Sequence, residues 1–206
     1  MKTLLQLNSS IFSAGGQSSR LADDFVAAWR KANSDGTVVV RDLASDPVPH
    51  LSAERFLSFL AKPGERTPAQ QAVVKHSDAL IEELKRADVI VIGLPMYNFG
   101  LPSTLKAYFD HIARAGVTFR YTDTGAVGLL TGKKAYVFAT RGGKYAGTPL
   151  ESQTPYVRQF LNFLGIEDIE FIYAEGLAIS DASKEAGIAA ARGAIERMSA
   201  KEPLAA

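Results

Sequence analysis

Short runs of apolar residues alternate with longer stretches of helical period along the chain. One run, Val89–Gly93, is rich in β-branched residues without polar alternation, which is typical of a strand buried on both faces. Between the runs, apolar residues recur three and four positions apart, as in Leu21, Phe25 and Trp29. The predicted strands are Thr3–Leu7, Thr37–Arg41, Val89–Gly93, Ala135–Thr140 and Ile169–Ala174.

Five strand–helix repeats predict a three-layer α/β fold, in which a five-stranded parallel sheet has right-handed crossovers and helices on both faces. One helix start is well marked, because Thr67, Pro68 and Gln70 have the spacing of a capping box with proline at the first helical position. That helix is expected to run to about Arg86. No linker, repeat or low-complexity tract is visible, so we expect a single domain over residues 1–206.

Two stretches do not fit the simple alternation. Gly116–Gly132 carries an alternating apolar segment, Val117–Tyr121, followed by Asp123–Gly125, which predicts an inserted β-hairpin. Ala44–Glu65 has apolar residues at helical spacing. That spacing fits a lid over a pocket and a dimer contact equally well.

The composition removes several classes of function. The chain has 23 Lys plus Arg against 22 Asp plus Glu, a formal net charge of +1, and no cysteine. A balanced charge favours neither nucleic acid nor an anionic membrane as partner. The absence of cysteine excludes disulfides, thiolate metal sites and cysteine nucleophiles. Since no export segment or membrane span is visible, we expect a cytoplasmic protein.

Ligands of open parallel sheets bind beyond the carboxyl ends of the strands, which directs attention to three loops. The loop after the first strand, Asn8–Arg20, is rich in Ser, Gly and amide groups and leads directly into a helix. Such a helix start can bind an anion through its unpaired N–H groups. The same residues could equally serve as a plain helix cap, with Ser18 or Ser19 in that role.

The loop after the third strand, Leu94–Pro102, is stiffened by two prolines and carries Tyr97 and Phe99. Aromatic and amide groups in alternation suit a flat heteroaromatic ring, which needs stacking on its faces and hydrogen bonds at its edge. The alternative is that Met96 and Phe99 fold into the core. The position at the carboxyl end of a sheet favours a ligand wall.

The loop after the fourth strand, Thr140–Tyr145, contains two consecutive glycines whose N–H groups could face the polar edge of such a ring. An ordinary flexible turn is the alternative, with Arg141 and Lys144 in solvent. Three loops of this kind at one edge strengthen the case for a ligand site beyond what any one of them supports.

No group of residues is recognisable as the catalyst. His50, His76 and His111 lack metal-ligand spacing and read as surface or helix residues, and no GxSxG motif supports a hydrolase triad. We therefore expect no metal site and no catalytic side chain. A protein with a ring-shaped pocket but no catalyst of its own indicates a bound cofactor that carries the chemistry.

The motif Met96–Phe99 directly after a buried strand resembles the FMN-dependent NADH:quinone oxidoreductases known as azoreductases. The loops Ser9–Ser18 and Arg141–Gly143 and the run Lys106–Tyr121 are similar to the same family. The likeness extends over essentially the whole chain, as far as Ala174–Gly176. It implies a flavodoxin-like fold with strand order 2-1-3-4-5.

The resemblance also implies where FMN binds. The residues implied to hold its phosphate are Ser10, Gly16, Gln17 and Ser18. Those implied to cradle the isoalloxazine are Pro95, Met96, Tyr97, Asn98 and Phe99. Those implied to contact the pyrimidine edge are Thr140, Arg141, Gly142 and Gly143. In this chain Gly16 and Thr140 stand where many relatives carry Ser.

The implied activity is two-electron transfer by a ping-pong mechanism, from NADH or NADPH through FMN to quinones or azo compounds. The family forms homodimers with two FMN sites at the interface. Phe99, Tyr121 and Phe163 are implied to wall the substrate slot, with Phe163 as a candidate contribution of the partner subunit, because it lies off the core stripe of its helix.

Two other functions compete with this reading. A flavodoxin-type electron carrier would bind FMN without accepting hydride from NADH, but such carriers are shorter and strongly acidic. A hydrolase, as some members of the family have been labelled by analogy, would need a nucleophile or metal cluster that the sequence does not show.

Overall fold

The structure of the protein, a computed structural model, describes residues 1–201. Five parallel strands form its main sheet, and all five predicted strands are confirmed, with ends that differ by at most two residues. They are β1 (Thr3–Asn8), β2 (Thr37–Asp42), β3 (Val89–Pro95), β6 (Lys134–Thr140) and β7 (Asp168–Ala174). The predicted single domain extends to residue 206, beyond the described residues, and stays a prediction.

The order of the strands in the sheet is β2-β1-β3-β6-β7. The predicted order 2-1-3-4-5 was stated loosely, because it numbers only the strands of the parallel sheet. The inserted hairpin contributes β4 and β5 between the third and fourth of them and forms a separate two-stranded sheet. The predicted α/β class, with five parallel strands and a small antiparallel hairpin, is confirmed.

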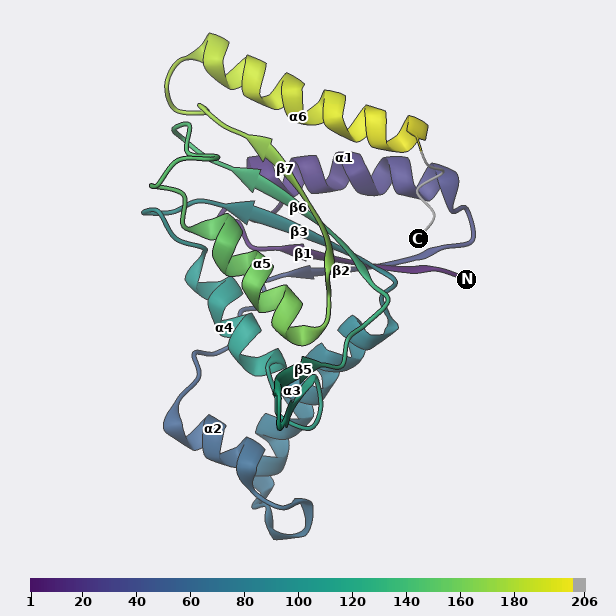
Figure 1. The fold of residues 1–206 in the computed structure, drawn as a ribbon, viewed down its shortest axis with the longest axis vertical. Helices are drawn as coiled ribbons and strands as arrows, with labels where there is room; N and C mark the ends of the chain where they lie inside the picture. Colours follow the sequence, from purple (N-terminus) through teal and green to yellow (C-terminus); the bar gives the residue numbers. More distant parts are fainter. Residues whose placement is uncertain (202–206) are drawn as a thin grey trace.

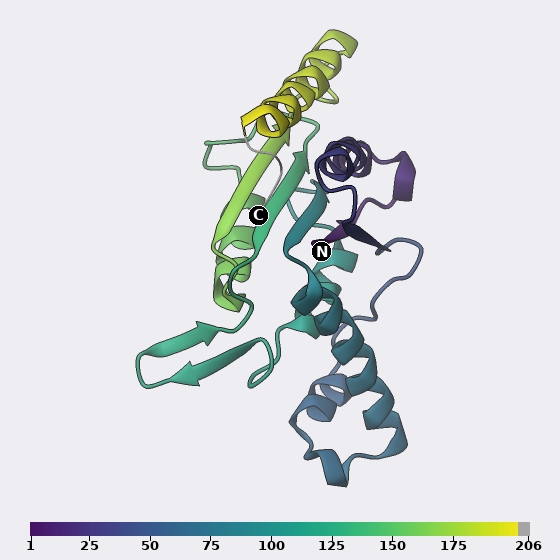
Figure 2. The same ribbon diagram turned by 90° about the vertical axis from the view of Figure 1, so that its right-hand side faces the viewer.

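Helices cover both faces of the sheet (Figures 1 and 2). One face carries α1 (Gln17–Ala32) and α6 (Asp181–Lys201). The other carries α3 (Pro68–Arg86), α4 (Ser103–Ile112) and α5 (Gln153–Leu164). Two short 3-10 turns, Ser13–Gly15 and Pro63–Glu65, complete the helical elements together with α2 (Ala53–Leu60).

Strand β3 lies at the centre of the molecule, and each of its seven residues is buried. Ile90 and Ile92 belong to the hydrophobic core under α3, α4 and α5. Val89 and Val91 belong to the second core, under α1 and α6. Because side chains alternate between two apolar layers, the strand needs no polar positions, which explains its uninterrupted apolar sequence.

The predicted start of α3 is confirmed in detail. The Thr67 hydroxyl accepts a hydrogen bond from the Gln70 backbone N–H at 3.2 Å, and the Gln70 side-chain oxygen accepts one from the Thr67 N–H at 3.0 Å. Pro68 occupies the first helical position, where no N–H partner is missed.

The inserted hairpin is also confirmed, with β4 (Phe119–Thr122) and β5 (Gly125–Gly128) joined by a two-residue turn. It lies against the carboxyl end of α5, where the Leu130 N–H donates to the Leu164 carbonyl at 2.8 Å. A Cβ atom at Gly128 would lie only 2.0 Å from the Gly165 nitrogen. Close backbone contact therefore fixes the hairpin at that end of the helix.

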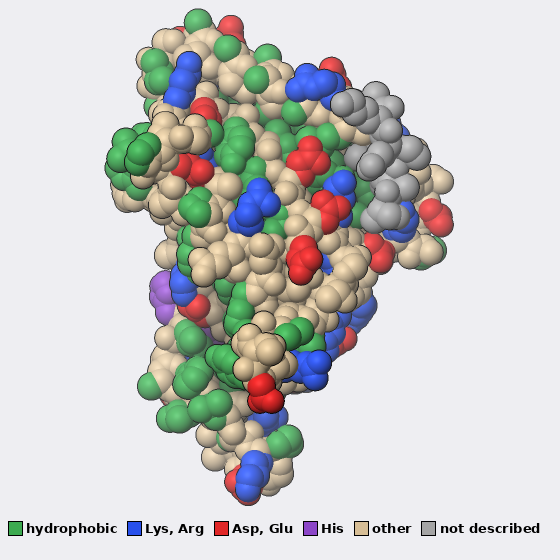
Figure 3. Space-filling model, in the orientation of Figure 1, with side chains coloured by type: hydrophobic (Ala, Val, Ile, Leu, Met, Phe, Trp, Pro, Cys, Tyr) green, Lys and Arg blue, Asp and Glu red, His purple; other side chains and the backbone are tan. Residues whose placement is uncertain are grey.

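The Ala44–Glu65 stretch folds into α2, which packs against α3 and extends the lower end of the molecule in Figure 1. Phe59 contacts the His111 ring edge-on at 5.9 Å between ring centroids. Phe56, Leu57 and Leu60 remain exposed, and hydrophobic side chains gather over this part of the surface in Figure 3.

His111, which read from sequence as a surface or helix residue, is a fully buried helix residue. Its Nδ1 lies 2.9 Å from the Ala107 carbonyl oxygen, and Arg55 of α2 and His76 of α3 face its ring. Burial lowers the pKa of His111, which the Ala107 hydrogen bond only partly offsets. The folded protein therefore favours the neutral imidazole.

This environment predicts a loss of stability in mild acid. Since the pKa of His111 is lower in the folded than in the unfolded chain, stability is full above the unfolded value of about 6.5 and falls as pH drops through the folded value. Urea unfolding at a series of pH values from 7.5 to 5 measures it. His111→Gln is expected to flatten the decline below pH 6.5, whereas His50→Gln, at an exposed position, keeps the wild-type profile. An unchanged decline in His111→Gln would contradict the assignment.

Candidate cofactor site

Three loops meet at the carboxyl edge of the sheet, as the parallel topology requires. The Ser9 hydroxyl donates to the Gly93 carbonyl at 2.6 Å and so joins the end of β1 to β3. The Met96 N–H donates to the Thr140 carbonyl at 2.9 Å and joins the loop after β3 to the end of β6. The predicted site residues on these three loops thus belong to one connected surface.

The first loop is folded against Tyr97. Ser10 is buried, and its hydroxyl lies 3.3 Å from the Tyr97 hydroxyl and accepts a hydrogen bond from the Phe12 N–H. The Ile11 N–H also donates to the Tyr97 hydroxyl. Gly16 packs on Ser10, since a Cβ there would lie 2.2 Å from its hydroxyl oxygen. The loop in this conformation therefore has no room for a serine side chain at position 16.

The amino end of α1 has the features of an anion site. No side chain caps it, although Gly16 is its N-cap residue and Gln17 begins the helix. The hydroxyls of Ser18 and Ser19 are buried and lack a hydrogen-bond partner among the described residues. An unpartnered hydroxyl beside unpaired N–H groups at the positive end of a helix suits a phosphate. Of the two readings of this loop, the missing cap favours anion binding.

The second loop forms a tight turn between Tyr97 and Gly100, whose backbones exchange hydrogen bonds at 3.1 and 2.9 Å. The two central residues, Asn98 and Phe99, both have positive φ, at 50° and 64°. This conformation is uncommon for residues other than glycine. Phe99 is half-exposed and contacts Tyr145 edge-on, so the alternative that it folds into the core is wrong.

The third loop has its two glycine carbonyls bonded within the protein. The Gly142 and Gly143 carbonyls accept hydrogen bonds from Ala178 and Gly176, in the segment after β7. In the described residues the N–H groups of the two glycines have no backbone partner of their own. Their amides are therefore the groups of this loop that can meet a ligand.

Arg141 lies in the same loop, but its side chain is fully buried. Its guanidinium pairs with Glu151 at 2.6 Å and Glu175 at 3.2 Å and lies over the Tyr173 ring at 4.8 Å. The guanidinium is thus neither in solvent nor free to contact a ligand. A contact of Arg141 with the cofactor remains possible only through its backbone.

Sequence reasoning did not identify the residues that fix these loops. One Glu175 oxygen accepts the N–H groups of Tyr145 and Ala146 at 2.7 and 2.9 Å. The Gln153 side chain donates hydrogen bonds to two backbone carbonyls of the second loop, one on each side of its tight turn. Glu175 directly follows β7, so the same sheet-edge rule could have included it. Nothing in the local pattern around Gln153 indicates its role.

Two of the predicted substrate residues lie elsewhere in the chain. Phe163 is partly buried and packs on Phe119 with ring centroids 4.3 Å apart, and Tyr121 lies exposed on the other side of Phe119. Both lie where the hairpin packs on the carboxyl end of α5. The second loop contacts the amino end of the same helix, at Gln153. Gln153 and Phe163 are ten positions apart on this helix, a distance of about 15 Å along its axis. A single chain does not bring Phe99 together with Tyr121 and Phe163.

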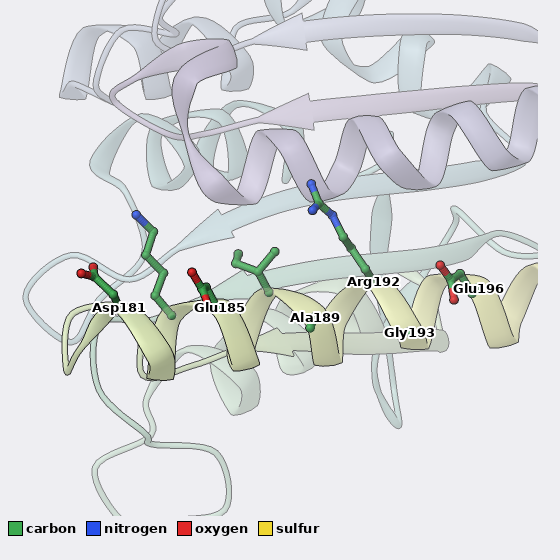
Figure 4. Close-up of a pocket in the computed structure, with 8 residues that line it drawn as sticks. Asp181, Glu185, Ala189, Arg192, Gly193 and Glu196 are labelled. Carbon is green, nitrogen blue, oxygen red and sulfur yellow. The ribbon is translucent and has the colours of Figure 1, made fainter.

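Other hollows of the surface lack the character of a ring site. A groove of about 650 Å³ runs along α6, between residues of both charges (Figure 4). It includes Arg192, which pairs with Asp24 of α1. A smaller apolar hollow of about 270 Å³ on α5 is lined by Tyr156, Gln159, Phe160 and Phe163. Within residues 1–201 no three metal-ligating side chains lie together, and no helix there is long and apolar enough to cross a bilayer.

Comparison with known proteins identifies the family of this chain. A family model described as a flavodoxin-like fold matches residues 1–198. The chain is 54% identical over 197 residues to an FMN-dependent NADH:quinone oxidoreductase of Cellvibrio japonicus, covering 96% of this chain and 98% of that protein. It is 50% identical over 189 residues to a protein of the same name from Alcanivorax borkumensis, covering 92% and 96%.

Two solved structures of azoreductases have the same fold as this chain. An azoreductase from Bacillus anthracis str. Sterne superposes with a TM-score of 0.89 at 28% identity, over 98% of this chain and all of that one. An FMN-dependent NADH-azoreductase from Bacillus anthracis str. Ames Ancestor, solved in complex with FMN, superposes with a TM-score of 0.85 at 28% identity, over 97% of this chain and all of that one.

The burial of Arg141 predicts that this residue stabilises the fold. Arg141→Met leaves the Glu151 and Glu175 carboxylates without their cation in a largely buried position, and we expect a loss of about 3 kcal/mol in the free energy of unfolding. Urea denaturation at 25 °C measures it. The control is Arg158→Met, which removes an exposed guanidinium lying over the Phe171 ring and is expected to cost less than about 1 kcal/mol. Equal stabilities of the two variants would refute this role.

Proposed function

This chain belongs to the family of proteins with a flavodoxin-like fold, and from that premise we propose that it is an FMN-dependent NADH:quinone oxidoreductase that also reduces azo compounds. The observation that carries the proposal is the uncapped start of α1, with its unpartnered buried hydroxyls, on the same sheet edge as an aromatic loop and two glycine amides. A phosphate and a flat ring on one ligand require this combination.

The residues present fit FMN. Ser10, Gly16, Gln17 and Ser18 would hold its phosphate, through the unpaired N–H groups of the first helical turn and the unpartnered Ser18 hydroxyl. Pro95 and the loop Met96–Phe99 would lie along the ring, with the turn at Asn98 held by the hydrogen bonds between Tyr97 and Gly100. Thr140, Arg141, Gly142 and Gly143 would meet the pyrimidine edge, Arg141 through its backbone only.

Bound FMN would supply two-electron chemistry, accepting a hydride from NADH or NADPH and then reducing a quinone or an azo compound in a ping-pong sequence. The residues of the chain bind and orient the reactants. The half-exposed Phe99 ring offers a face on which a flat substrate can stack, and its contact with Tyr145 limits its rotation. No side chain at this edge needs to act as a nucleophile.

A second copy of the chain would complete the substrate slot. Within one chain, Tyr121 and Phe163 lie at the opposite end of α5 from Phe99, so the three aromatic residues can form one wall only between two subunits. The exposed Tyr121 ring and the apolar hollow at Phe160 and Phe163 support such an interface. We therefore propose a homodimer with two FMN sites at the interface. Its cytoplasmic location remains a prediction from the sequence.

The proposal predicts a yellow protein with about one FMN per chain that NADH reduces directly. The measurement is anaerobic stopped-flow absorbance of the FMN-loaded protein mixed with NADH, followed by addition of a quinone or an azo dye. We expect flavin bleaching with NADH and recovery of the oxidised spectrum with either acceptor. FMN binding without bleaching would instead indicate an electron carrier, and a protein that does not bind added FMN would overturn the proposal.

The phosphate site gives a second, residue-level prediction. Ser18→Ala removes the free hydroxyl without changing the helix start, and we expect the Kd for FMN to rise about tenfold or more, since a hydrogen bond to a charged group is lost. Riboflavin, which lacks the phosphate, is expected to bind wild type and Ser18→Ala alike. Fluorescence titration measures both ligands. Ser45→Ala, at an exposed serine, serves as control, and equal FMN affinities in all three proteins would disprove the assignment.

A further inference from the structure

The loop that would lie along the flavin ring contains a backbone conformation that its own residues do not favour. Asn98 and Phe99 occupy consecutive positive φ values, in a turn that most often contains glycine. Asn tolerates this region better than most residues, but a bulky residue such as Phe does so rarely. Something outside the turn must therefore stabilise it.

Gln153 supplies two of the bonds that do so. Its Nε2 donates to the Pro95 carbonyl at 2.9 Å and to the Gly100 carbonyl at 3.0 Å. These two carbonyls lie on either side of the two residues with positive φ. The Gln153 side chain is almost completely buried, so both hydrogen bonds form away from water. The adjacent Ser152 hydroxyl also donates to the Phe99 carbonyl inside the turn.

The orientation of the Gln153 amide follows from chemistry. The opposite orientation would place its Oε1 against two carbonyl oxygens, none of which can donate. In the orientation found, both N–H groups are used, while Oε1 is buried without a partner in the part of the chain that the structure describes. The two hydrogen bonds that fix the Pro95 and Gly100 carbonyls thus leave the Oε1 atom of the same amide unpaired.

The helix that carries Gln153 is itself anchored. Gln153 is the first residue of α5, and one oxygen of Glu151 accepts the Thr154 N–H at 2.8 Å. The same oxygen pairs with buried Arg141, which belongs to the loop after β6. The ion pair between Glu151 and Arg141 thus fixes the start of α5 and with it Gln153. Gln153 in turn fixes the loop after β3 through its hydrogen bonds.

We propose that Gln153 is a positioning residue for FMN, which holds the loop Met96–Gly100 in its strained turn so that the loop meets the flavin ring. This inference rests on the proposed function. Gln153 bonds to this segment only through the Pro95 and Gly100 carbonyls, so it acts through the backbone geometry of the turn between them.

The primary test is Gln153→Met, which keeps the length of the side chain and removes both donors. We expect the Kd for FMN to rise about tenfold to a hundredfold, since two buried hydrogen bonds are lost. The matched control is Gln71→Met, the same change at an exposed position of α3, with wild-type affinity expected. Wild-type FMN affinity in Gln153→Met would overturn the proposal.

A double-mutant cycle separates positioning from simple packing. Phe99→Asn places a residue that tolerates positive φ in the turn, so the turn depends less on Gln153. We expect Gln153→Met to weaken FMN binding by a clearly smaller factor in the Phe99→Asn background than in wild type. The same factor in both backgrounds would mean that Gln153 acts only through packing, and would refute the proposal.

Amide hydrogen exchange in the FMN-free protein keeps this test independent of the proposed function. In wild type the Tyr97 and Gly100 N–H groups are bonded across the turn. Gln153→Met is expected to speed their exchange at least tenfold, while exchange in the strands β1 and β6 is unchanged. If the protein binds no FMN, faster exchange still supports the role of Gln153 in holding the turn. Unchanged exchange at Tyr97 and Gly100 overturns that role.

Should Gln153→Met fail to fold, Gln153→Asn provides the second variant. Its amide is shorter by one methylene and can reach one of the two carbonyls at most. We expect exchange at Gly100 and the Kd for FMN to lie between those of wild type and a complete loss. Wild-type values for both would contradict the proposal.

Discussion

Burial of β3 on both faces is the constraint on which the rest of the molecule depends. A strand with no exposed residue needs an apolar layer above and below it, and the two hydrophobic cores under α1 with α6 and under α3, α4 and α5 provide them. Its neighbours β1 and β6 run parallel to it, so all three strands end at one edge. The topology of the sheet therefore places the loops that follow these strands side by side, whatever contacts they make with one another. The candidate site is thus a consequence of how the centre of the sheet is buried.

Polar contacts then turn this shared edge into a surface of fixed shape. Tyr97 bonds the loop after β3 to the loop after β1, and Arg141 connects the loop after β6 to Glu151 at the start of α5. Most of these groups are buried or partly buried, where an unpaired charge is expensive and a paired one is held firmly. The edge therefore has rigid walls made from backbone and buried ion pairs, and it leaves amides, a hydroxyl and aromatic rings for a ligand. A site whose charged side chains are paired inside the protein, and which offers a ligand only neutral groups, suits a cofactor that carries out the chemistry itself.

The sequence predicted the elements well, because each depends on nearby residues. The apolar run at β3, the capping box at Thr67 and the hairpin turn after Thr122 are local patterns, and each was found where expected. The loops of the site were also predicted, since their place follows from the alternation of strands and helices. Their internal contacts were not. Arg141 read as a solvated or ligand-binding side chain, and His111 as an unremarkable helix position, because burial by elements far along the chain leaves no local pattern.

Gln153 shows why such residues escape sequence reasoning. The residues it bonds lie 58 and 53 positions away, at the end of a strand and beyond a turn. In the sequence, a glutamine at the start of a helix that holds a distant loop looks the same as one in solvent. Only the packing of the helix against the strand distinguishes the two. Yet the turn it holds has a local mark, since Asn98 and Phe99 adopt positive φ without glycine. A strained turn in a loop thus implies a partner elsewhere in the fold, and the loop's sequence alone cannot identify that partner. The shape of this edge accordingly depends on the hydrogen bonds from Gln153 at the start of α5 as much as on the residues that face the ligand.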